Sequence, residues 1–138
     1  MSRVAPWVAV EPSTTPAAIL GNLPMTQGSV SFPLPASVVP AGASGLLLFA
    51  WASLAGKNPS LAYWHVASTL PDGSQDWFSL LVAGDPSGRG VVCNSQAFWL
   101  PPSASGAITV SLHLNDLPSP GNQGQVEIHG YSLGTDIS

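Results

Sequence analysis

Apolar and polar residues alternate along several short segments of the chain. In 106–114 branched apolar residues occupy every second position, and 125–131 repeats the pattern. A strict period of two places one set of side chains in a core and the other in solvent, which is typical of a β-strand. We expect these two segments to pair as a C-terminal hairpin, with Leu112 opposite Val126.

Other segments rich in β-branched and aromatic residues predict further strands. They are 4–10, 29–34, 46–54, 61–69, 76–83, 90–93 and 97–100. Fourteen prolines and fourteen glycines interrupt the chain and leave almost no window for an α-helix. Parallel sheets need helical crossovers, so the predicted fold is all-β, an antiparallel β-sandwich or jelly roll.

The pattern contains no internal repeat and no second hydrophobic unit. A chain of 138 residues fits one domain with one core. We therefore predict a single domain over 1–138. Within it, 11–27 contains prolines and many Ser, Thr and Ala residues, and it predicts an extended arm or long connection.

The chain is poor in charged residues. Only 7% are Asp, Glu, Lys or Arg, against about 25% in an ordinary domain. Three basic residues cannot form the phosphate-neutralising surface that nucleic acid requires, so we expect no nucleic-acid partner. A surface of hydroxyl and amide groups with little charge repulsion favours a homo-oligomer.

No segment predicts a membrane span. The longest apolar run, 45–55, is far shorter than the roughly 20 residues that a spanning helix needs. The N-terminus lacks the basic and apolar regions of a signal peptide. The sequence thus assigns no compartment, and an extracellular or cell-surface-facing role is our working hypothesis.

One motif has the form of a catalytic signature. Gly130–Gly134 reads G-Y-S-L-G, which matches the nucleophile elbow of α/β-hydrolases. An elbow needs a following helix, acid and histidine, and only four residues remain, so we interpret the motif as the exit from a strand. The single cysteine, Cys93, is expected to be a buried apolar residue. We predict no enzymatic activity.

Tryptophan is frequent, with five copies. The adjacent aromatics Tyr63-Trp64 and Trp77-Phe78 must point to opposite faces of their strands. An outward Trp lies under a loop, fills an oligomer interface or stacks on a sugar ring. The predicted ligand-binding residues are Trp64, His65, Trp77, Asn122 and Gln123.

The loop 115–124 is rich in Asn, Asp, Pro and Gly. Carboxylate and carbonyl oxygens in a tight loop are the ligands that Ca²⁺ accepts, and the same residues form ordinary Asx turns. The sequence leaves both interpretations open.

Two fragments resemble the small calcium-dependent galactose-binding lectins of bacteria. The first is G-A-I-T-V followed by N-D-L-P and G-N-Q-G-Q-V-E-I, in 106–128, and the second is A-W-A-S-L in 50–54. That family is a jelly-roll-like sandwich in which a calcium ion bridges protein and sugar. The resemblance implies Ca²⁺ as cofactor and, as metal ligands, Asp116, Asn122, Gln123 and the carbonyl of Leu54. The loop is shorter here, Gln123 replaces an asparagine, and the family's His-Pro-x-x-Gln sugar contact has no counterpart.

These patterns favour a non-catalytic, lectin-like β-sandwich that binds neutral glycans as an oligomer, for example in cell adhesion. The alternative is a structural or assembly jelly roll, such as a capsid, spike, tail-fibre or C1q-like trimerising domain, without a small-molecule ligand. Proline-rich connections and scarce lysine suit this alternative equally, and outward tryptophans would then lie between subunits.

Overall fold

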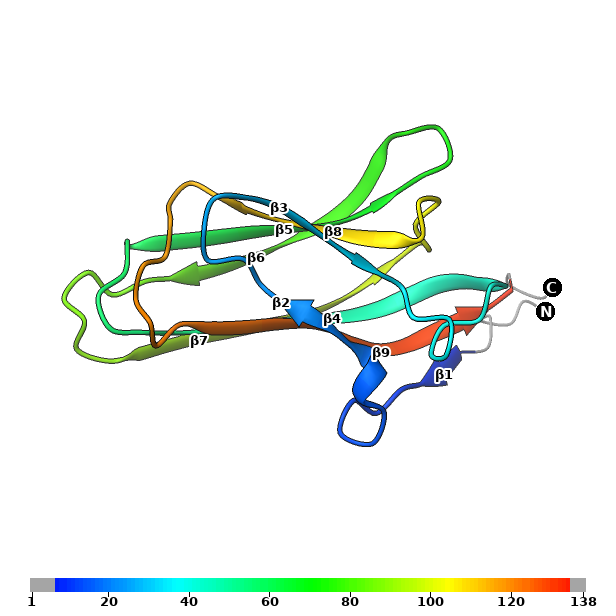
Figure 1. The fold of residues 1–138 in the computed structure, drawn as a ribbon, viewed down its shortest axis with the longest axis horizontal. Helices are drawn as coiled ribbons and strands as arrows, with labels where there is room; N and C mark the ends of the chain where they lie inside the picture. The colour runs from blue at the N-terminus through cyan, green and yellow to red at the C-terminus, as the bar shows by residue number, and fades with distance from the viewer. Residues whose placement is uncertain (1–6, 135–138) are drawn as a thin grey trace, which may run out of the picture.

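The computed structural model describes residues 7–134 as two antiparallel β-sheets packed face to face (Figure 1). The strands are β1 (Trp7–Ala9), β2 (Ile19–Asn22), β3 (Gly28–Pro33), β4 (Ala43–Ala55), β5 (Leu61–Thr69), β6 (Gln75–Ala83), β7 (Val91–Leu100), β8 (Ala107–His113) and β9 (Gln123–Leu133). Among the described residues the single helical element is a 3-10 turn, η1 (Pro16–Ala18). The predicted all-β sandwich is confirmed, whereas the assignment of all of 1–138 to one domain stays a prediction.

The strands follow the order of a jelly roll. Sheet I contains β2-β9-β4-β7, with β1 also paired to β9, and sheet II contains β3-β8-β5-β6. From β2 onward, every connection crosses between the sheets except the β5–β6 hairpin (Figure 1). Strands that are neighbours in space are therefore mostly distant in the sequence.

The predicted C-terminal hairpin is wrong, because β8 and β9 belong to different sheets. Leu112 in β8 pairs with Gly28 and Trp64, while Val126 in β9 pairs with Ala50. Leu112 and Val126 are nevertheless both buried, as their alternation predicts. A period of two fixes which face of a strand is buried and says nothing of the neighbouring strand.

Other predicted strand boundaries need smaller corrections. The segments 90–93 and 97–100 are parts of one strand, β7. Of the predicted strand 4–10, β1 holds only Trp7–Ala9, and residues 4–6 lie outside the described part. The connection 11–27 includes η1 and also β2, which pairs with β9.

Cys93 is exposed, so its predicted burial is wrong. It lies in β7 opposite Ser53, whose neighbours Ala52 and Leu54 are buried. Ser53 and Cys93 therefore share the outer face of sheet I. Register outweighs the general preference of free cysteine for the interior.

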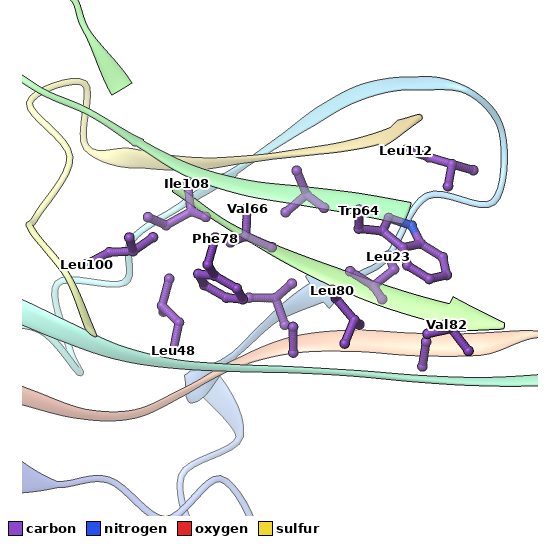
Figure 2. Close-up of a cluster of buried hydrophobic side chains, with 14 of the residues drawn as sticks. Leu23, Leu48, Trp64, Val66, Phe78, Leu80, Val82, Leu100, Ile108 and Leu112 are labelled. Carbon is purple, nitrogen blue, oxygen red and sulfur yellow. The ribbon is translucent and has the colours of Figure 1, made fainter. Parts of the chain in front are cut away.

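The inward side chains of both sheets form one hydrophobic core (Figure 2). Fully buried members include Leu46, Leu48, Leu54, Trp64, Val66, Leu80, Ile108, Val110, Val126 and Ile128. Burial of each large apolar side chain contributes about 1.5–3 kcal/mol. The indole Nε1 of Trp64 donates to the Pro24 carbonyl at 2.8 Å, so this buried polar group keeps a partner. Where the edge strands β6 and β7 of the two sheets face each other, Phe78 stacks on Phe98 with ring centroids 4.1 Å apart.

Candidate functional site

The outer face of sheet II carries a row of polar side chains. Val66 on β5 is buried, so the preceding residue His65 faces solvent. The register places His65 between Ser79 on β6 and Ser111 on β8, and Ser111 beside Ser29 on β3. The row thus crosses all four strands of the sheet.

The next row contains a small residue at its centre. Ala67 lies between Trp77 on β6 and Thr109 on β8, and Ser31 on β3 completes the row. Because an alanine side chain ends at Cβ, the surface is hollowed at this point by about 300 Å³. The hollow is lined by Ser29, His65, Ala67, Gln75, Thr109, Ser111 and His113.

Aromatic rings gather beside this hollow. The rings of His65 and Trp77 have centroids 4.0 Å apart and are tilted by 56°. Tyr63 lies 5.9 Å from His65, and His113 lies 5.4 Å from both of them. Trp77 remains 51% exposed. The half-exposed indole of Trp77 offers an apolar surface next to polar groups. A ring with one apolar face can stack on such a surface.

Hydroxyl groups in the two rows pair across the strands. Ser29 and Ser111 share a hydrogen bond of 2.6 Å, and Ser79 donates to the Tyr63 hydroxyl at 2.9 Å. A hydroxyl has one donor and two acceptor positions, so each of these bonds leaves capacity for a ligand.

This face carries no formal charge. The outward residues of β3, β5, β6 and β8 include no Asp, Glu, Lys or Arg. Burial, and to a smaller extent the charge of His113, lowers the pKa of His65 from its ordinary value of 6.5. His65 is therefore neutral at pH 7 and provides one donor and one acceptor. The face suits an uncharged ligand rich in hydroxyl groups.

Of the predicted ligand residues, the structure brings His65 and Trp77 together and separates Trp64 from them. Trp64 is fully buried in the core, and its adjacent residue Tyr63 faces outward instead. Trp64 has no surface on which a ligand can stack, so it does not belong to the site.

Asn122 and Gln123 lie elsewhere, at the start of β9 in sheet I. Asn122 exchanges two amide hydrogen bonds with Asn58, at 2.7 and 3.0 Å. Its Oδ1 also accepts from the backbone N–H of Ala55 at 3.2 Å. The side chain of Asn122 thus links two loops.

Two of the four predicted calcium ligands, Asp116 and Asn122, already accept hydrogen bonds from other protein groups. Asp116 Oδ1 accepts from the backbone N–H of Gln27 at 2.7 Å. Leu54, which the resemblance gives as a backbone-carbonyl ligand, lies near the end of β4. Because the Oδ1 atom of Asn122 already accepts from two protein donors, Asn122 does not fit as a free metal ligand. In residues 7–134 no three His, Cys, Asp or Glu side chains cluster around a common point. Calcium at this loop stays a prediction from the sequence.

The sequence did not point to the polar members of the face. Ser29, Thr109 and Ser111 are ordinary outward residues of alternating strands. Nothing in their local sequence indicates that β3, β8 and β5 are neighbours. Only the position of Trp77 beside β5 has a local signal in the sequence. The short turn at 70–74 joins β5 to β6 and determines their register.

Comparison with known proteins assigns the chain to no family. No family model matches it, and no curated protein matches it. Among solved structures, "Family 16 Carbohydrate Binding Module-2" aligns at a TM-score of 0.39 and 14% identity, covering 91% of this chain and 85% of that one. An uncharacterized protein from Listeria monocytogenes EGD-e aligns at a TM-score of 0.37 and 13% identity, covering 97% of this chain but 11% of that protein.

In residues 7–134 no helix has the length and apolar character that crossing a membrane requires.

Proposed function

We propose that this protein is a non-catalytic carbohydrate-binding module, and that it binds a neutral glycan on the outer face of sheet II. The observation that carries the proposal is the His65–Trp77 pair, with ring centroids 4.0 Å apart, beside hydroxyl rows on a face without formal charge. A sugar ring combines an apolar C–H face with hydroxyl groups that donate and accept hydrogen bonds, and this surface offers both complements.

In this proposal the exposed indole of Trp77 packs against the apolar face of one sugar ring. His65 and Ser111 line the hollow and bind hydroxyl groups of that ring or of the next one along the glycan. Solvent-exposed stacking and a few neutral hydrogen bonds give weak affinity per site. Oligomerisation, which the scarcity of charged residues favours, would raise the avidity for a repetitive glycan.

The test is a calorimetric titration of the full chain with maltotetraose, cellotetraose and mannotetraose. We expect Trp77→Ala to weaken binding of the preferred sugar at this face at least tenfold. Val91→Ala, which removes an exposed apolar side chain from β7, serves as the control and leaves binding unchanged. Absence of heat with every member of a broad neutral glycan panel overturns the proposal.

The surroundings of Ser132 support a role without catalysis. The serine of the G-Y-S-L-G motif lies within β9, pairs with Trp7 on β1 and shares a hydrogen bond of 2.9 Å with Ser44. A nucleophile elbow requires a strand-to-helix turn and an adjacent histidine base. Turnover in an ester or glycoside screen, lost in Ser132→Ala, would contradict this part of the proposal.

Exposed apolar side chains favour the assembly module as the second candidate. Trp7, Leu81, Val91 and Trp99 are each about half exposed or more, and Trp7 and Trp99 meet edge to face with centroids 5.8 Å apart. Large apolar surface of this kind is often covered by another subunit. Light scattering distinguishes the candidates: a closed oligomer of constant mass that responds to no glycan supports assembly alone.

A further inference from the structure

A second hollow, of about 470 Å³, lies at Trp51 in sheet I. Asn22 on β2, Gln125 on β9 and Trp51 on β4 are register partners, so their side chains share one face of the sheet. Ala50, next to Trp51, is fully buried. The shared face is therefore the outer face, on the opposite side of the sandwich from His65 and Trp77.

The indole of Trp51 is held in place by a carboxylate. Its Nε1 donates to Glu127 Oε2 at 2.8 Å, and the other oxygen of Glu127 lies 2.9 Å from His129 Nε2. The Glu127 side chain is only 14% exposed, and the His129 ring stacks on Phe49 with centroids 4.7 Å apart. The position of the Trp51 ring is thus fixed by the protein, which lowers the entropy cost of binding a ligand against it.

Three amide side chains around Trp51 have unused hydrogen-bonding capacity. Those of Asn22, Gln123 and Gln125 line the hollow, and none of them makes a hydrogen bond to another described residue. Each amide offers two donor hydrogens and one acceptor oxygen. The lining contains no charged residue. An uncharged ligand with many hydroxyl groups and one apolar face matches this combination.

We propose that this hollow is a second binding site for a neutral sugar ring, which packs near the Trp51 indole and hydrogen-bonds to Asn22, Gln123 and Gln125. The inference rests on the proposed function, because both sites take the same class of ligand. The inner faces of the two sheets enclose the core, so the two sites, each on an outer face, lie on opposite sides of the sandwich. One chain then binds two separate glycan strands and holds them together.

The experiment is a titration of the full chain with maltotetraose, cellotetraose and mannotetraose, followed by calorimetry and by the indole N–H signals of Trp51 and Trp77 in NMR spectra. We expect two sugars per chain and shifts of both indole signals. The double variant Asn22→Ala/Gln123→Ala removes two exposed amides that take no part in the core. It is expected to bind one sugar and to shift only Trp77. Gln96→Ala, an exposed amide on β7, is the matched control.

The outcomes separate the two proposals. If Trp77→Ala abolishes all binding and the double variant binds like the wild type, the second site is overturned and the site on sheet II stands. If the double variant loses binding while Trp77→Ala retains it, the second site stands and the site on sheet II is overturned. No binding by the wild type overturns both.

Discussion

Asn58 and Asn122, 64 positions apart in the sequence, exchange a reciprocal pair of amide hydrogen bonds. Asn58 is only 4% exposed, and its Nδ2 also approaches the carbonyl oxygens of Ala55 and Gly56 at 3.3 Å. The pair joins the loop that follows β4 to the loop that precedes β9. It links the two loops at the end of sheet I near the Trp51 hollow.

Replacement of the Asn58 amide nitrogen, which donates to Asn122, should lower the free energy of unfolding. In Asn58→Asp a carboxylate oxygen replaces Nδ2 and faces three acceptor oxygens, so we expect a loss of at least about 1–3 kcal/mol of unfolding free energy at pH 7. The loss should shrink at pH 4, where protonation restores a donor. Urea denaturation at both pH values measures it. Asn115→Asp, in an exposed position, is the control, and an equal loss there would contradict the prediction.

The buried indole of Trp64 contributes both volume and a hydrogen bond. Trp64→Phe leaves a cavity and removes the donor to the Pro24 carbonyl, so we expect a loss of about 2–4 kcal/mol. The same substitution at the exposed Trp77 should change stability by less than about 0.5 kcal/mol. Chemical denaturation of the two variants checks this contrast, and similar midpoints would disprove it.

His65 should make the fold less stable in mild acid. Its folded-state pKa lies below 6.5, so as pH falls through 6.5 the unfolded chain takes up a proton before the folded chain does. The free energy of unfolding therefore decreases below about pH 6.5 and levels off once folded His65 is protonated. The decrease is small because the ring is partly solvated. Denaturation between pH 7.5 and 5, compared with His65→Gln, isolates it.

The smaller cause of that pKa shift can be removed separately. In His113→Gln the charge facing His65 disappears while its burial remains, so the pKa of His65 should rise and still stay below 6.5. An NMR titration of the His65 imidazole signals in both proteins measures the difference. A pKa that does not move would show that His113 has no electrostatic effect.

Gly84 should tolerate no side chain. A Cβ at this position would overlap the carbonyl oxygen of Pro59, a backbone atom that cannot rotate away. We expect Gly84→Ala to cost about 1–3 kcal/mol. A Cβ at Gly42 meets nothing within 4 Å, so Gly42→Ala should be nearly neutral. Thermal unfolding of both variants provides the comparison, and equal melting temperatures would contradict the steric argument.

The fold class could be predicted from the sequence because it depends on local patterns. Alternation in 106–114 and 125–131 identified the buried faces of β8 and β9 correctly, except at Leu114, which lies beyond the end of β8 and is exposed. Their pairing could not be predicted, since Leu112 and Val126 find partners in strands far away in the sequence. Exposure of Cys93 was missed for the same reason, because it depends on the register of β7 against β4.

The site was predictable only where its geometry is local. His65 and Trp77 belong to the β5–β6 hairpin, whose short turn brings them together. Adjacent aromatics such as Tyr63 and Trp64 must face opposite ways, but the sequence does not say which one enters the core. The engagement of Asn122 with Asn58 depends on two loops that meet only in the folded protein.

The alternation of successive strands between the two sheets bears on how the chain reaches its native state. In residues 7–134 the β5–β6 hairpin is the one pair of consecutive strands that hydrogen-bond to each other. Most other native pairings must close a long loop, at a cost in chain entropy, before their contacts form. Folding should therefore take milliseconds to seconds rather than microseconds. During that interval the apolar edges of incomplete sheets are open to other chains, so refolding yield should fall as protein concentration rises.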